Sequence, residues 1–151
     1  MSHSSDSSPP PATTASSPAR GVRGLGLVVI LVGLLMAVAG VVTYVTVQQT
    51  LADQKITVAD DADFLAGDKV DGPFSAYAQA MVIGKHAEEI GGGKTYAELA
   101  QDDPARDTVM TASFLQASLF TSVVAFGVAV LVIALGGLLV LIGLALRRLS
   151  P

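Results

Sequence analysis

Residues 91–95 read Gly-Gly-Gly-Lys-Thr, which looks like the end of a phosphate-binding loop. That loop requires GxxxxGK followed by Ser or Thr, so that backbone N–H groups at a helix N-terminus can cradle phosphates. With Gly93 and Lys94 at its end, the position of the first glycine is held by Glu88, whose carboxylate repels phosphate. The preceding residues also have helical rather than strand spacing. We therefore predict that the chain binds no nucleotide.

The same stretch is better interpreted as a link between two helices. Gly91 can turn left-handed after the first helix, and the next glycines form a flexible link. The run TYAE, Thr95 to Glu98, has the pattern of a capping box. It predicts a short helix from Thr95 to about Gln101 that buries Tyr96 and Leu99.

Acidic residues 60–63, read as DDAD, suggest a cation site because paired carboxylates suit hard cations such as Ca²⁺. An EF-hand register that begins at Asp61 puts Ala66 where glycine is required and Gly72 where the bidentate glutamate belongs. Asp60, Asp61 and Asp63 therefore remain weak metal candidates, and the alternative is a solvated acidic turn. We assign no metal site to them.

His86 and Glu89 form an i, i+3 pair that could bind a metal or move a proton. No second cluster of metal ligands accompanies them, and a solvated helix end is the better explanation of the pair. We therefore predict no catalytic residue, no cofactor and no metal, and we expect the protein not to be an enzyme.

The elements around these residues indicate a membrane protein. Half of the chain is hydrophobic (51%), but aromatic residues make up only 5% and tryptophan is absent, which is unusual for a soluble core. The apolar residues are concentrated in residues 25–47, without a charge for 23 residues, and in residues 108–146. Because about 20 apolar residues cross a bilayer, we predict an all-α protein with transmembrane helices at 25–47 and 118–146.

A cleavable signal peptide is the alternative for the first span, because Arg20 and Arg23 precede an apolar run and residues 37–39 are small. Cleavage there would leave an apolar new end, and the leader would be long. We expect the segment to be retained.

Arginines set the expected orientation in the plasma membrane, because basic residues are enriched on cytoplasmic flanks. Arg20 and Arg23 precede the first span, and Arg147 and Arg148 follow the second. Both termini should therefore be cytoplasmic, with residues 147–151 as a short end. Residues 1–24, rich in serine and proline, should form a disordered cytoplasmic tail.

Residues 48–117 should form a small acidic, helical extracytoplasmic region between the two spans of a hairpin. It holds twelve acidic residues against five basic ones, a net charge of −7, so a nucleic acid is an improbable partner. A helix beginning near Pro73 should present an apolar face. The last helix, with Asp103 as cap and Pro104 as first residue, should run unbroken into the membrane. The expected apolar face of the helix near Pro73 consists of Phe74, Tyr77, Ala78, Met81 and Val82. That of the last helix consists of Met110, Phe114 and Ala117.

The stretches KITVADDADFLAGDKVDGPFSAYAQ and KTYAELAQDDPARDTVMTASFLQASLFTSVVAFGVA resemble a family of small two-span membrane proteins from actinobacteria. The family often carries the label aromatic ring-opening dioxygenase. The resemblance covers about residues 25–148 and implies the two-span architecture; it implies no functional residues.

The activity in that label can be compared with the residues present. Extradiol cleavage requires Fe(II) held by two histidines and a carboxylate. The chain has two histidines, His3 in the tail and His86 beyond the first span, so a membrane would separate them. Ring cleavage is therefore the least favoured of three functional hypotheses.

Small residues recur every seven positions in both spans, a period that keeps one face toward a partner helix. This favours close packing within a helical hairpin or a homo-oligomer, and chance is the alternative. The predicted packing residues are Gly26, Gly33, Gly40, Ala129, Gly136 and Gly143.

Neither span carries a charge, which argues against a self-sufficient transporter. The first functional hypothesis is a non-enzymatic membrane module that binds another membrane or envelope protein. The second is an oligomeric pore or a transporter-accessory subunit. In both, the lipid bilayer is a partner.

Overall fold

The computed structural model describes residues 18–149, which form three α-helices: α1 (Pro18–Asp53), α2 (Pro73–Ile90) and α3 (Arg106–Leu149). Within this range the only β pairing is an isolated antiparallel bridge between Thr57 and Lys69. The all-α fold class is therefore confirmed. Residues 1–17 of the expected tail lie outside the described residues, whereas residues 18–24 belong to α1.

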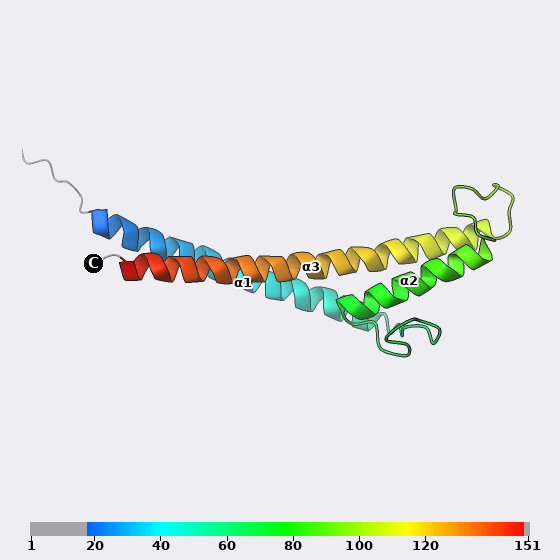
Figure 1. Cartoon of the computed structure of the whole chain (residues 1–151), viewed down its shortest axis with the longest axis horizontal. Helices are drawn as coiled ribbons and strands as arrows, with labels where there is room; N and C mark the ends of the chain where they lie inside the picture. The colour runs from blue at the N-terminus through cyan, green and yellow to red at the C-terminus, as the bar shows by residue number, and fades with distance from the viewer. Residues whose placement is uncertain (1–17, 150–151) are drawn as a thin grey trace, which may run out of the picture.

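The molecule is elongated, and α3 runs along most of its length (Figure 1). One half of α3 packs against α1, and the other half packs against α2. At 1.5 Å per residue, the 44 residues of α3 extend over about 66 Å and the 36 residues of α1 over about 54 Å. The end of α3 and the start of α1 lie at the same end of the molecule (Figure 1).

Two helices are long and apolar enough to cross a membrane: Gly21–Asp53 within α1, and α3. Only 17% of the most apolar window of each is buried inside the chain. Leucine and valine side chains therefore cover the outer surfaces of both helices. A helix in the core of a soluble protein would have most of these side chains covered.

The face of α2 that packs on α3 consists of small residues, so the predicted apolar face is wrong in part. Ala78 and Val82 are buried as expected, but Phe74 and Met81 are exposed. Ala76 and Ala80 are fully buried in their place. Small side chains let two helices approach closely, and this contact excludes the larger ones. The buried residues of α2 are Ser75, Ala76, Ala78, Ala80, Val82 and Ala87.

The start of α2 agrees with the expectation from Pro73, because a proline in the first helical turn lacks only an N–H that would have no partner there. The Ser75 hydroxyl accepts hydrogen bonds from the N–H groups of Asp71 and Gly72, both at 3.2 Å. The preceding segment, residues 54–72, is held by two buried valines, Val58 and Val70.

The left-handed turn after α2 begins one residue later than predicted. Gly91 has φ −75°, and the left-handed residues are Gly92 (φ 60°) and Gly93 (φ 81°). Gly93 N–H donates to Glu88 O at 2.8 Å and Gly92 N–H to Glu89 O at 3.2 Å. This is the hydrogen-bond pair of a Schellman motif, which satisfies the last carbonyls of the helix.

The predicted helix from Thr95 to Gln101 is wrong, because this segment forms turns. The Glu98 carboxylate accepts from the Thr95 N–H as a capping box requires, but the Thr95 hydroxyl also donates to that carboxylate, each at 2.8 Å. Arg106 then donates to the carbonyls of Tyr96 and Leu99, which a continuing helix would need for its own hydrogen bonds. Leu99 is buried as expected, whereas Tyr96 lies at the surface under the Arg106 guanidinium, 4.2 Å from the ring centre.

The last helix is unbroken, as expected, but it begins at Arg106, two residues after Pro104. Asp103 does not cap this helix as predicted: its Oδ1 accepts from Ala105 N–H at 2.9 Å, which forms a turn just before the first helical residue. The predicted inward stripe of α3 is wrong: Phe114 and Ala117 are exposed, while Val109 and Leu119 are buried. Packing against α2 selects a face rotated by about one residue from the most hydrophobic one.

Candidate functional site

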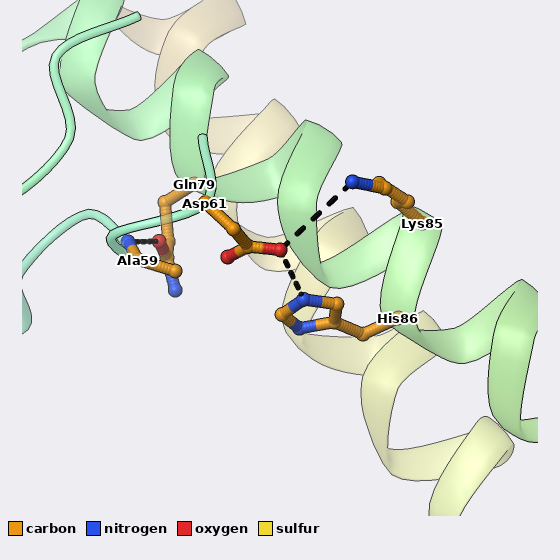
Figure 2. A network of polar contacts seen from close by, with 5 residues as sticks. All are labelled: Ala59, Asp61, Gln79, Lys85 and His86. Carbon is orange, nitrogen blue, oxygen red and sulfur yellow. Dashed lines mark hydrogen bonds and ion pairs between the residues drawn. The ribbon is translucent and has the colours of Figure 1, made fainter. Parts of the chain in front are cut away.

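Asp61 is the centre of the polar contacts that tie residues 54–72 to α2 (Figure 2). Its Oδ2 lies 2.8 Å from Nε2 of His86 and 3.9 Å from Nζ of Lys85. Lys85 and His86 both come from the second half of α2. Nearby, the Ala59 N–H donates to the Gln79 side-chain oxygen at 2.9 Å, as Figure 2 shows.

These contacts lower the pKa of the Asp61 carboxyl, mainly through the hydrogen bond with His86 and least through the charge of Lys85. In a hydrolytic triad, a carboxylate orients the imidazole of the histidine through a hydrogen bond of this kind. Such chemistry also requires a nucleophile beside the ring. Within residues 18–149 the His86 ring has Asp61 as its hydrogen-bond partner and no hydroxyl. The contacts of Asp61 with His86 and Lys85 therefore serve to hold residues 54–72 against α2.

The three weak metal candidates are not brought together as a cation site. Asp61 makes the contacts with α2, and Asp60 and Asp63 are exposed. No group of three or more His, Cys, Asp or Glu side chains among the described residues could hold a metal ion. His86 contacts Asp61 across 25 residues of chain, and no hydrogen bond or ion pair joins it to Glu89, the partner that the sequence spacing suggested.

A cavity of about 530 Å³ opens at the end of the molecule away from the C-terminus. It lies between the second half of α2, residues 93–96 and the first part of α3, and it is lined among others by Met81, Lys94, Tyr96 and Gln116. The Gln116 side-chain amide donates to Ala80 O at 3.2 Å and closes one wall. Lys94 reaches this cavity from the carbonyl end of α2, where the helix dipole disfavours anions. This location is unlike that of a phosphate loop.

The small residues of the two long helices lie opposite one another. A Cβ placed on Gly33 would lie 2.6 Å from Gly136 O, and one on Gly136 would lie 2.6 Å from Gly33 O and 2.7 Å from Ala37 N. These distances are too short for any side chain, so the backbones of α1 and α3 touch at this level.

The same close approach repeats one heptad away on each side. A Cβ on Gly143 would lie 2.6 Å from Gly26 O, and one on Gly40 would lie 2.9 Å from Ala129 O. All six predicted packing residues therefore lie at the α1–α3 contact of a single chain. In contrast, a Cβ on Gly127 or Gly137 would meet nothing within 4 Å.

Comparisons with protein-family models, with curated proteins and with solved structures find no match to this chain.

Two features of this region could not be found from sequence patterns. The Asp61–His86 contact joins residues 25 positions apart, which no helical or strand spacing relates. The cavity depends on how α2 packs on α3, and the apolar pattern of the sequence predicted the large residues of α2 at that contact. The one available signal was the four-residue spacing of Ala76 and Ala80, which puts two small side chains on one helix face.

Proposed function

We propose that the chain is a two-span membrane hairpin that holds an acidic helical arm outside the membrane, where the arm binds another membrane or envelope protein. The arm consists of α2, residues 91–105 and the first part of α3. The observation that carries this proposal is the continuity of α3, whose 44 residues are far more than the bilayer requires. One rigid helix thus joins a span to the arm.

The small buried fraction of the two apolar helices supports the membrane part of the proposal. Their exposed leucines and valines need an apolar environment, and a hydrocarbon layer about 30 Å thick would cover them. The arginine pairs at residues 20 and 23 and at residues 147 and 148 favour cytoplasmic termini. The central region is then extracytoplasmic.

The contact between α1 and α3 also supports retention of the first span. Removal of the chain up to Ala39 would take away Gly26 and Gly33 and leave Gly136 and Gly143 without their partner helix. The same contact weakens the hypothesis of an oligomeric pore, since the small-residue faces that suggested it are occupied within one chain.

The end of the arm provides the surface for a protein partner. The cavity of about 530 Å³ is open, and Met81 at its edge is exposed. The region between the spans has a net charge of −7, from twelve acidic and five basic residues. The charge of the whole region favours a partner with a basic surface, although the cavity itself is lined by two lysines, Lys85 and Lys94, and one glutamate, Glu88. Attraction between the two surfaces would speed association, and high salt would weaken it.

Site-specific photo-crosslinking in cells tests this function. A photoreactive residue at Met81 should give one adduct of defined size, whereas the same residue at Thr111 should give none. Thr111 is exposed on the opposite side of α3 from the cavity residues Val109, Ser113 and Gln116. Filling the cavity with Ser113→Trp should abolish the Met81 adduct, and Thr111→Trp should leave it intact.

Two outcomes would contradict the proposal. An adduct with the mass of two copies of this chain would mean self-association through the arm. Equal labelling from Met81 and Thr111, insensitive to Ser113→Trp, would mean that the arm has no specific partner.

A further inference from the structure

Six of the eight aromatic residues lie near the place where α2 begins, and five of them have rings close to one another. The Tyr77 ring lies 5.8 Å from that of Phe120 and 6.3 Å from that of Phe64. Slightly further along α3, the rings of Tyr44 and Phe126 meet at 4.8 Å. Phe74 lies one turn before Tyr77 on α2 and has no aromatic partner among these contacts.

The register of the helices gives the level of Phe74 along the molecule. Tyr77 faces Phe120, and Gln116 bonds to Ala80, so α2 runs antiparallel to α3. Three residues before Tyr77, Phe74 is then level with about residue 123 of α3. Tyr44 of α1 faces Phe126, so three residues later Val47, the end of the apolar run 25–47, is also level with about residue 123.

Phe74 is 74% exposed, and it is the most exposed of the phenylalanines in the structure. Its surroundings continue the apolar surface of the long helices, because Val124 on α3 is also exposed and Phe64 and Tyr77 are each 42% exposed. An uncovered patch of this kind marks a surface that contacts lipid or another apolar group.

The charged residues of α2 lie away from this exposed apolar surface. Residues 73–84 carry no charge, and the four acidic and basic side chains of the helix follow: Lys85, His86, Glu88 and Glu89. Before the helix, Asp68, Lys69 and Asp71 lie close to Phe74 around a shallow depression. The aromatic end of α2 is therefore flanked by charged groups on one side and by the apolar helices on the other.

We propose that the first turns of α2, with Phe74, Phe64 and Tyr77, lie in the outer membrane–water interface and contact lipid. This inference rests on the proposed membrane hairpin and adds a lipid contact for the base of the arm. Aromatic rings prefer this depth, where one side is apolar and the other is wet. Asp68, Lys69 and Asp71 would lie among the headgroups, and the contact would fix how far the arm stands above the bilayer.

The absence of tryptophan from the chain allows a direct test, because one introduced tryptophan is the only indole in the protein. Three variants of the full chain are compared in phosphatidylcholine vesicles whose acyl chains carry bromine at different depths. Phe74→Trp is the test position. Phe114→Trp is the matched control: Phe114 is 68% exposed but lies about 13 Å before residue 123 on α3, on the side away from the C-terminus. Leu35→Trp, at a residue 70% exposed, marks the middle of the first span.

The inference predicts a graded result. Fluorescence from Leu35→Trp should be quenched most by bromines deep in the bilayer, and that from Phe74→Trp most by bromines near the headgroups. Phe114→Trp should keep its fluorescence and should emit at the longest wavelength.

Other results separate the two proposals. If Leu35→Trp is quenched while Phe74→Trp behaves like Phe114→Trp, the lipid contact is wrong and the membrane hairpin stands. Blue-shifted but unquenched emission from Phe74→Trp would mean that protein rather than lipid covers this surface, which also overturns the inference. If Leu35→Trp is not quenched, the hairpin itself is wrong.

Discussion

At the scale of single residues, Asp61 determines how the loop before α2 is held. Its pKa is lowered, so its contribution to stability is present above the ordinary aspartate value of 3.8 and is lost as the pH falls through the lower value of the folded protein. His86→Ala should raise the pKa of Asp61 more than Lys85→Ala does, because the hydrogen bond with His86 is the larger cause. NMR titration of the Asp61 carboxyl measures both shifts.

The consequence for the loop can be followed separately. Asp61→Asn should increase hydrogen exchange in residues 54–72, because a neutral amide is a weaker partner for Lys85 and His86 than a carboxylate. Asp63→Asn, at an exposed neighbour, is the control and should leave exchange unchanged. Equal exchange in both variants would show that the Asp61 contact does not hold the loop.

At the scale of secondary-structure elements, close contact between α1 and α3 depends on glycine at specific positions. Gly136→Ala should destabilise the protein by about 1–3 kcal/mol, because the new Cβ would collide with the backbone of α1 at Gly33 and Ala37. Gly137→Ala should be neutral or stabilising by up to about 1 kcal/mol, because alanine is the better helix former. Thermal unfolding in detergent compares the two variants.

The comparison of these two variants separates the effect of the new Cβ on helix packing from the general effect of replacing glycine by alanine in a helix. Both replace a glycine by an alanine in adjacent positions of one helix, but a Cβ at Gly137 would meet nothing within 4 Å. If the two variants unfold alike, α1 and α3 do not pack through these glycines in the membrane.

At the scale of the whole molecule, the prediction concerns topology. A reporter that is active only in the cytoplasm should work when fused to either terminus and fail when inserted at Gly92, because the two arginine pairs favour cytoplasmic ends. Gly92 is exposed in the link after α2, where an insertion disturbs no packing. Immunoblotting of each fusion controls for expression, and activity at Gly92 alone would reverse the orientation.

Much of the fold could be predicted from patterns along the chain. Uncharged runs indicated the two long helices, and the heptad spacing of Gly26, Gly33 and Gly40 indicated one face of α1. The outer region was harder, because its faces are decided by packing. Phe74 and Met81 are among the largest apolar residues of α2, yet both are exposed and alanines are buried instead. The turn at residues 95–101 likewise depends on Arg106, which lies beyond the segment itself.

By itself, the sequence determined that the chain is all-α with two long apolar helices, because apolar length and helical periodicity are local properties. It also determined the acidity of the central region and the absence of a second histidine near His86. Only the tertiary structure decided that Gly33 meets Gly136 within one chain, that Asp61 pairs with His86, and that Phe74 is left exposed beside the apolar helices. These are contacts between distant segments, and they follow from the register of the helices, which no pattern within one helix can specify.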